Sequence, residues 1–200
     1  MIAQARSKRH MPMTSAPLTL LPVSTTDDRE TARRLIGEYL NWISDIAGEQ
    51  YRLSFDIDAM LRSDLDDATK FYPPHGRFYL VQSRDGAIGV GALKRLAVEV
   101  GEIRRMYVQP SARGLGAGRL LVQRLLDDAR ALGLRRVRLE SLKALAAAHA
   151  LYRSVGFVEI APYADSSMQD YQSHTALQGY RASAVFMEIE LARGIALAAV

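Results

Sequence analysis

The segment Arg113–Gly118 (RGLGAG) constrains the fold of this 200-residue chain most strongly. Its three glycines lie between a strand-like run, residues 101–108, and an amphipathic segment that ends at Gly133. Glycine removes the Cβ atoms that would keep a ligand away from the backbone. The first turn of a helix adds free N–H groups and the positive end of the helix dipole. The sequence therefore predicts a strand, a glycine turn and a helix that bind an anion such as phosphate, with a glycine-softened turn that binds nothing as the alternative.

The runs on both sides of this segment predict one sheet. Upstream, strand-like runs at 77–83, 87–96 and 101–108 form a meander whose first turn is Asp85-Gly86. Downstream, strands and helices alternate. This order favours an α+β (mixed α/β) fold over a doubly wound one. The other expected elements are strands at 18–24, 136–141, 157–163 and 184–191, and helices that begin at Asp27 and span 57–71 and 144–155.

Four details of these elements are also predicted. Asp27 with Glu30 indicates a capping box at the start of the first helix. The acidic stretch Asp64–Asp67 is expected to be a solvated helix face. Residues 164–183 form a polar connection that is long for a simple loop. The apolar face of the first helix is expected to hold Ala32, Leu35, Ile36, Tyr39, Leu40 and Ile43.

Composition excludes several classes of chemistry. The chain has no cysteine, which rules out disulfides, thiolate metal sites and a cysteine nucleophile. Much of the net charge of +4 comes from Arg6, Lys8 and Arg9 near the start of the chain, so we expect no nucleic-acid partner. No apolar run reaches the roughly 18 residues of a membrane span. We expect a cytoplasmic protein with no membrane contact.

The residue at position 119 distinguishes between the known glycine motifs that this turn resembles. A Walker loop requires Gly-Lys-Ser/Thr, and Arg119 follows Gly118 here. A dinucleotide fingerprint requires glycine at position 119, although Glu140 would suit the acid that binds ribose in that fold. The pattern Arg-x-x-Gly-x-Gly fits without a mismatch at Arg113, Gly116 and Gly118.

With this turn, Glu102–Val108 (EIRRMYV), Ala150–Phe157 (ALYRSVGF) and Phe186–Leu191 (FMEIEL), the sequence resembles the GNAT superfamily of acyl-CoA-dependent N-acetyltransferases. The resemblance implies a single, mostly antiparallel sheet of about six to seven strands. It also implies helices on both faces and a V-shaped splay between the two central strands. The acetyltransferase domain would span residues 17–192, between a flexible N-terminal extension, 1–16, and a C-terminal tail, 193–200.

The resemblance also implies acetyl-CoA as co-substrate, with no metal. The backbone of residues 106–108 would bind the pantetheine arm, and the Val108 N–H would polarise the thioester carbonyl. The backbone of residues 114–118 would bind the pyrophosphate between two arginines. The implied binding residues are Met106, Tyr107, Val108, Arg113, Gly114, Leu115, Gly116, Ala117, Gly118 and Arg119.

Two side chains are candidates for proton transfer. Glu102 would be the general base, with an ion pair to Arg95 or Arg104 as the alternative. Tyr152 would protonate the leaving thiolate, with a packing role as the alternative. Strand alternation predicts that Glu102 shares one strand face with Arg104, Met106 and Val108.

One family position differs. Many members have an asparagine seven residues before the tyrosine, where this chain has Leu145. The absence of cysteine favours direct transfer in a ternary complex over an acyl-enzyme on sulfur. His149 is expected on a helix surface, and the four histidines show no metal-binding spacing.

The acceptor side is expected at residues 45–60 and 163–183, where aromatic and acidic side chains would suit a cationic amine. The second region contains Tyr163, Asp165, Asp170, Tyr171 and Tyr180, and a solvated polar loop is the alternative. The acceptor itself, a small amine, an amino acid, a peptide N-terminus or a protein lysine, stays open, as does a homodimer. A non-catalytic acyl-CoA sensor and a dinucleotide-binding domain are the rival functions.

Overall fold

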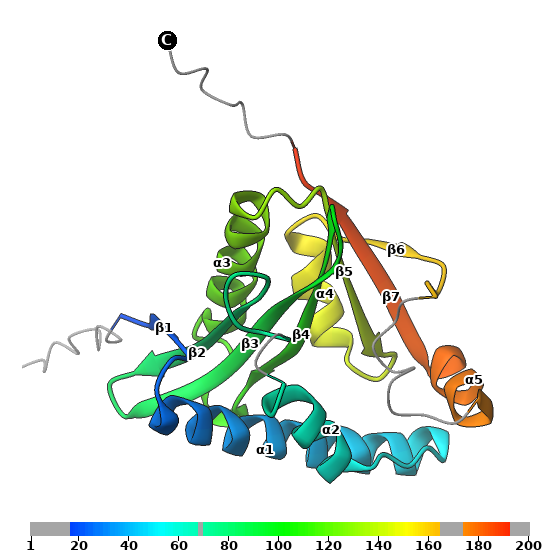
Figure 1. Cartoon of the computed structure of the whole chain (residues 1–200). Helices are drawn as coiled ribbons and strands as arrows, with labels where there is room; N and C mark the ends of the chain where they lie inside the picture. Colours follow the sequence, from blue (N-terminus) through cyan, green and yellow to red (C-terminus); the bar gives the residue numbers. More distant parts are fainter. Residues whose placement is uncertain (1–16, 68–69, 165–173, 193–200) are drawn as a thin grey trace, which may run out of the picture.

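The computed structural model describes residues 17–67, 70–164 and 174–192 (Figure 1). Along the chain, its elements are β1 (Thr19–Pro22), α1 (Thr26–Tyr51), α2 (Ile57–Leu65), β2 (Arg77–Ser83), β3 (Gly86–Ala97), β4 (Val100–Val108), the 3-10 turn η1 (Pro110–Ala112), α3 (Ala117–Ala131), β5 (Arg136–Leu142), α4 (Ala146–Ser154), β6 (Val158–Ile160), α5 (His174–Ser183) and β7 (Ala184–Glu190). Across these ranges, no helix combines the length and apolar character needed to span a membrane.

The strands form one seven-stranded sheet in the order β1-β2-β3-β4-β5-β7-β6. All neighbouring pairs are antiparallel except the central pair, β4 and β5. These two strands pair only from Val100 with Arg136 to Glu102 with Arg138. Both continue for several residues beyond this pairing and diverge (Figure 1). The predicted α+β fold, with a single sheet and a V-shaped splay, is confirmed.

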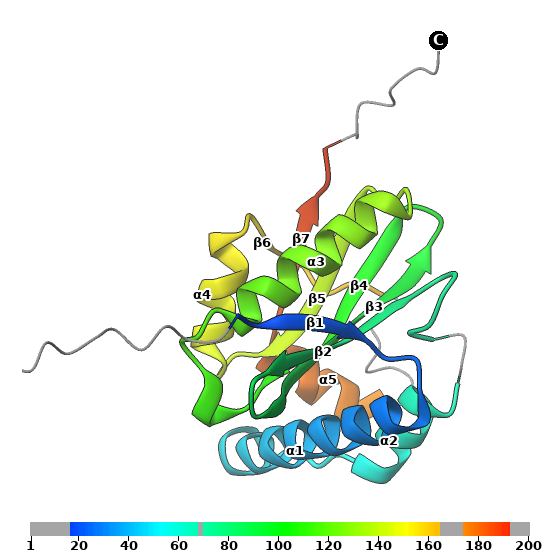
Figure 2. The same ribbon diagram turned by 90° about the vertical axis from the view of Figure 1, so that its left-hand side faces the viewer.

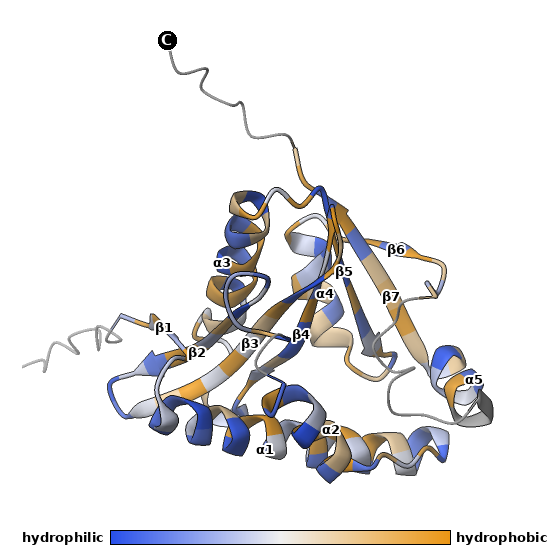
Figure 3. Cartoon of the chain, in the orientation of Figure 1, coloured by the Kyte–Doolittle hydropathy of each residue, from blue (hydrophilic) through white to orange (hydrophobic). Residues whose placement is uncertain are grey.

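Helices cover both faces of the sheet and enclose two apolar cores (Figure 2). One core lies under α1 and includes Leu35, Ile36 and Leu40, which the first helix was predicted to bury. The other lies under α3 and includes Leu121 and Leu125. Figure 3 shows much of the hydrophobic colour on strands such as β3 and β7, between the helical layers. The two cores hold the central strands in place from both sides.

Helix boundaries differ from the sequence predictions at three places. The capping box is formed by Thr25 and Asp28, so the prediction of Asp27 with Glu30 is wrong. The second helix, α2, ends at Leu65, six residues before the predicted end at residue 71. The stretch predicted as a polar connection contains α5. Gly133, at which the segment after the glycine turn was predicted to end, has a positive φ of 74°, and Gly156 after α4 has a positive φ of 107°.

Asp64 of α2 is fully buried, so the prediction of a solvated acidic face over Asp64–Asp67 is wrong at its first residue. Its carboxylate forms ion pairs with Lys70 (3.5 Å), Arg104 (3.6 Å) and Arg105. Burial alone would raise the pKa of Asp64, but the three cations, Arg105 foremost, outweigh burial and lower this pKa below its ordinary value. Asp64 therefore ties α2 to β4 as an anion.

We expect Asp64→Asn to lower the free energy of unfolding by about 3–5 kcal/mol, because it leaves buried cations without their anion. The lowered pKa sets the sign of the pH dependence. The stability from ionised Asp64 is complete above its unfolded pKa of about 3.9 and is lost as pH falls below that value through the folded pKa. Urea unfolding at several pH values measures both effects.

The control is Asp66→Asn, because the Asp66 carboxylate pairs with Arg33 on the surface. We expect this control to cost less than about 1 kcal/mol. Equal losses in the two variants would contradict a structural role for the buried ion pairs.

Candidate active site

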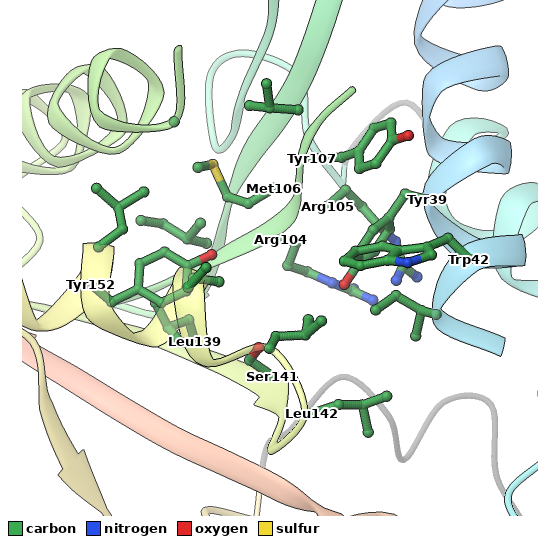
Figure 4. Close-up of a pocket in the computed structure, with 18 of the residues that line it drawn as sticks. Tyr39, Trp42, Arg104, Arg105, Met106, Tyr107, Leu139, Ser141, Leu142 and Tyr152 are labelled. Carbon is green, nitrogen blue, oxygen red and sulfur yellow. The ribbon is translucent and has the colours of Figure 1, made fainter. Parts of the chain in front are cut away.

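A cavity of about 650 Å³ lies at the splay of the central strands. Its walls come from β4, the glycine turn, the start of α3, β5, α4 and α1. Figure 4 shows Tyr152 on the α4 side of this space and Tyr39 and Trp42 on the α1 side, with β4 residues between them. The separation of two strands thus exposes strand backbone to a space large enough for a ligand.

The glycine turn leaves one end of the cavity open at the backbone. Gly114 and Gly116 have φ angles of +84° and +89°, which L side chains rarely adopt. A Cβ atom at either position would meet no protein atom within 4 Å. Gly116 is the N-cap of α3, and no side chain caps this helix end. The N–H groups of the first turn are therefore available to an anion, as predicted for a phosphate site.

The two arginines that flank this turn are held in place by other contacts. The Arg113 guanidinium lies over the Trp42 ring at 4.7 Å, and its Nε donates to the Val108 carbonyl at 3.3 Å. Arg119 donates to the Ser154 hydroxyl at 2.8 Å. Both arginines line the cavity, so they add positive charge near the uncapped helix end.

A β-bulge changes the side-chain alternation of β4. The register with β3 shifts between Val90 and Ala92, and Arg105 opposite has a positive φ of 54°. Met106 and Val108 consequently pack toward the α3 core, whereas the Arg104 side chain pairs with Asp64 of α2 on the other face. The prediction that Glu102, Arg104, Met106 and Val108 share one face is wrong beyond Arg104. An extra residue in the strand is the physical reason.

Glu102 does not line the cavity. It is fully buried, and its Oε1 accepts a hydrogen bond of 2.8 Å from the Tyr163 hydroxyl. Its Oε2 lies 3.8 Å from the Nε of Arg104. The Arg104 contact matches the ion pair that the sequence left open as the alternative to a catalytic role. These contacts do not test whether Glu102 is the general base, and that role stays a prediction.

Tyr152 of α4 lines the cavity and is nearly fully buried. Its ring packs edge-on against Phe157, with 5.8 Å between centroids. Burial, with a smaller contribution from Tyr39, raises the pKa of Tyr152 well above its ordinary value. The hydroxyl is therefore protonated throughout the neutral range and has a proton to donate.

The cavity gathers ten of the twelve predicted site residues. The ten that line it are Met106, Tyr107, Val108, Arg113, Gly114, Gly116, Ala117, Gly118, Arg119 and Tyr152. The exceptions are Glu102 and Leu115, whose side chain is exposed by 53%. Leu145, which stands where many family members have asparagine, also lines the cavity, as the N-cap of α4.

Glu140 on β5 is a carboxylate of the cavity wall that sequence reasoning did not assign to catalysis. Burial raises the pKa of Tyr180, and the nearby Glu140 carboxylate raises it further. For Tyr39, burial raises the pKa, Arg105 opposes this rise and Glu140 adds to it. Glu140, Arg105 and these two tyrosines therefore lie within electrostatic reach of one another. Glu140 lies two residues after Arg138, the last residue of β5 that pairs with β4, and a glutamate in this strand was the available signal.

The acceptor side differs in part from its prediction. Tyr180 lines the cavity with Phe55, whereas Tyr163 is buried against Phe186 and Glu102. The predicted acceptor residues Asp165, Asp170 and Tyr171 lie outside the described residues.

His149 was expected on a helix surface, and this prediction is wrong. It is buried on α4, and burial is the main cause of a lowered pKa. The side chain does not line the cavity. Over the described parts of the chain, no cluster of three or more metal-binding side chains is found.

The splayed strands, the uncapped glycine turn and the buried tyrosine are the arrangement of an acyl-CoA-dependent acyltransferase. The chain belongs to the acetyltransferase (GNAT) family, whose family model matches residues 39–157. The IAA acetyltransferase of Azospirillum brasilense is 31% identical over 134 residues, which cover 65% of this chain and 78% of that protein.

Solved structures show the same fold. A GNAT-family acetyltransferase from Staphylococcus aureus superimposes with a TM-score of 0.65 and 17% identity, over 88% of this chain and all of that one. The PaiA N-acetyltransferase from Thermoplasma acidophilum, solved in complex with coenzyme A, gives a TM-score of 0.62 at 17% identity, over 88% of this chain and 99% of that one.

Proposed function

We propose that this protein transfers the acetyl group of acetyl-CoA to a primary amine by direct attack in a ternary complex. The observation that carries the proposal is the divergence of β4 from β5 after Glu102, directly before the open glycine turn. One strand edge and one helix end thus face the same cavity. The coenzyme A complex of the Thermoplasma protein, which has the same fold, supports this assignment of the cavity.

The cavity residues supply distinct parts of the reaction. The glycine turn with Arg113 and Arg119 binds the pyrophosphate, and the backbone of residues 106–108 aligns the pantetheine arm. The amine nitrogen attacks the thioester carbonyl carbon, a C–N bond forms and the C–S bond breaks. The departing thiolate takes the proton of the Tyr152 hydroxyl, while the proton that the nitrogen loses as the amide forms passes to solvent, from which Tyr152 is reprotonated. The Val108 N–H stabilises the developing oxyanion.

A carboxylate is also needed, because an alkyl ammonium with a pKa of about 10.4 must lose a proton before it attacks. Glu102 is the carboxylate that the sequence proposes. Its burial outside the cavity wall allows it to act only through an intervening group such as water. Glu140 faces the cavity directly and is the second candidate.

We expect Glu140→Gln to lower kcat/KM for the acceptor by about 100-fold, in the range of general-base catalysis, and to remove the acidic limb of its pH profile. Glu102→Gln is the matched comparison, because it changes a carboxylate that contacts Tyr163 and lies outside the wall. We expect Glu102→Gln to lower the free energy of unfolding and to change kcat/KM for the acceptor less than Glu140→Gln does. A lost acidic limb in Glu102→Gln, with a normal profile in Glu140→Gln, would return the base role to Glu102.

The direct test of the proposed function is an acceptor panel with acetyl-CoA, read by the thiol released and by the mass of the product. Acetylation of at least one amine is expected. Tight binding of acetyl-CoA with no amine acetylated would instead indicate a non-catalytic acyl-CoA sensor.

A further inference from the structure

Five charged side chains line the cavity among the described residues: Arg104, Arg105, Arg113, Arg119 and Glu140. Arg113 and Arg119 flank the glycine turn. The other three lie on the splayed strands, with both arginines three to four residues before the end of β4. Figure 4 shows the Arg104 side chain running from β4 toward Tyr39 of α1. The part of the cavity away from the turn therefore contains two cations and one anion.

The bulge in β4 places both arginines against the same carboxylate. Neighbouring residues of a regular strand point to opposite faces. Arg104 and Arg105 nevertheless both reach Asp64, because Arg105 has the positive φ of the bulge. A left-handed conformation is unfavourable for a residue other than glycine. Such strain is found most often where a backbone positions functional groups.

Asp64 does not satisfy every donor of Arg105. It is shared by Lys70, Arg104 and Arg105, and an arginine alone has five N–H donors in a planar fork. The Nη2 atom of Arg105 is buried and has no hydrogen-bond partner in the described structure. A buried donor without a partner is costly, and a ligand carboxylate is the group that an arginine fork pairs with best.

We propose that the acceptor is an α-amino carboxylate with an apolar or aromatic side chain. Arg105, supported by Arg104, binds its carboxylate, and its ammonium lies toward Glu140. The apolar wall residues Trp42 and Phe55 contact the side chain. This inference rests on the proposed function and narrows its acceptor. The carboxylate of the zwitterion is complementary to Arg105 and its ammonium to Glu140, while Asp64 already pairs with both arginines from behind the wall.

The charge arrangement has a chemical consequence. An acceptor without a carboxylate leaves the Nη2 donor of Arg105 unpaired, and sites built to hydrogen-bond a substrate group discriminate strongly against analogues that lack it. A carboxylate held by Arg105 also fixes the position of the amine relative to the thioester, so we expect the carboxylate to affect turnover as well as binding.

The test uses the full-length wild-type protein, acetyl-CoA and matched acceptors: phenylalanine, phenylalaninamide and 2-phenylethylamine, then leucine and 3-methylbutylamine. We expect kcat/KM to be at least about 100-fold higher for each carboxylate than for its amide or decarboxylated partner. Acetylation of 2-phenylethylamine as fast as phenylalanine would overturn the carboxylate site and leave the proposed function intact. Acetylation of no member of the set would overturn this inference, and failure of the whole acceptor panel would overturn the proposed function as well.

Arg105→Lys provides the second measurement, because it retains the positive charge beside Asp64 and removes the fork. We expect at least about a 30-fold loss of kcat/KM for phenylalanine and less than about a twofold change for 2-phenylethylamine and for acetyl-CoA affinity. Equal losses on both acceptors would show that Arg105 only supports the fold and would overturn the proposal. If the variant does not fold, the wild-type acceptor pairs decide.

Discussion

Gly116→Glu is expected to abolish measurable acetyl-CoA binding, which corresponds to a loss of at least about 100-fold in affinity. Gly116 is the N-cap of α3, and a Cβ placed on it meets no protein atom within 4 Å. The new side chain therefore extends into open space and places a carboxylate where the pyrophosphate is proposed to bind. Like charges repel at close range, and the same N–H groups cannot serve both anions. Isothermal titration with acetyl-CoA measures the effect.

Gly133→Glu is the matched control for backbone strain. Gly133 follows the other end of α3, has a φ of +74° and also has open space around its Cβ position. Both variants force an L residue into a left-handed conformation, but only Gly116 lines the cavity. We expect Gly133→Glu to bind acetyl-CoA like the wild type. Wild-type affinity in Gly116→Glu would contradict the assignment of the turn.

Tyr152→Phe is expected to lower kcat by about 100-fold or more and to change the KM for acetyl-CoA by less than about threefold. The hydroxyl is the one group removed, and burial keeps it protonated. Because the pKa of Tyr152 is raised, the wild type should lose no activity through this group below about pH 10. Steady-state kinetics from pH 6 to about pH 10 measure both expectations.

Tyr79→Phe is a suitable control for losing a buried tyrosine hydroxyl. Tyr79 is also buried, its hydroxyl accepts a hydrogen bond of 3.1 Å from Arg124, and it does not line the cavity. We expect this variant to lose stability with kcat unchanged. A Tyr152→Phe enzyme with wild-type turnover would remove Tyr152 from the role of acid.

The sheet was predictable because its signals are local. Alternating apolar residues, the Asp85-Gly86 turn and the glycines at helix ends each act over a few residues. The splay was not visible in these patterns. It arises from the pairing of β4 with β5, which are far apart in the sequence, and was expected only from the resemblance to a family.

Two of the wrong predictions, the solvated Asp64 and the shared face of β4, depend on tertiary contacts. The residues next to Asp64 in the sequence do not distinguish it from a solvated helix residue. The cations that pair with it lie on β4 and in the segment after α2. The bulge at Arg105 shifts the strand period by one residue, which the sequence pattern alone does not reveal. Arg104 and Arg105 are adjacent charged residues in a largely buried strand, and this pair was the signal that could have indicated a charged cavity wall.

A crystal structure with bound coenzyme A tests the central claim most directly. We predict that the diphosphate lies on the N–H groups of residues 114–118 and that the sulfur lies between Val108 and the Tyr152 hydroxyl. A diphosphate bound elsewhere, with the space beside Gly116 filled by side chains, would contradict the account.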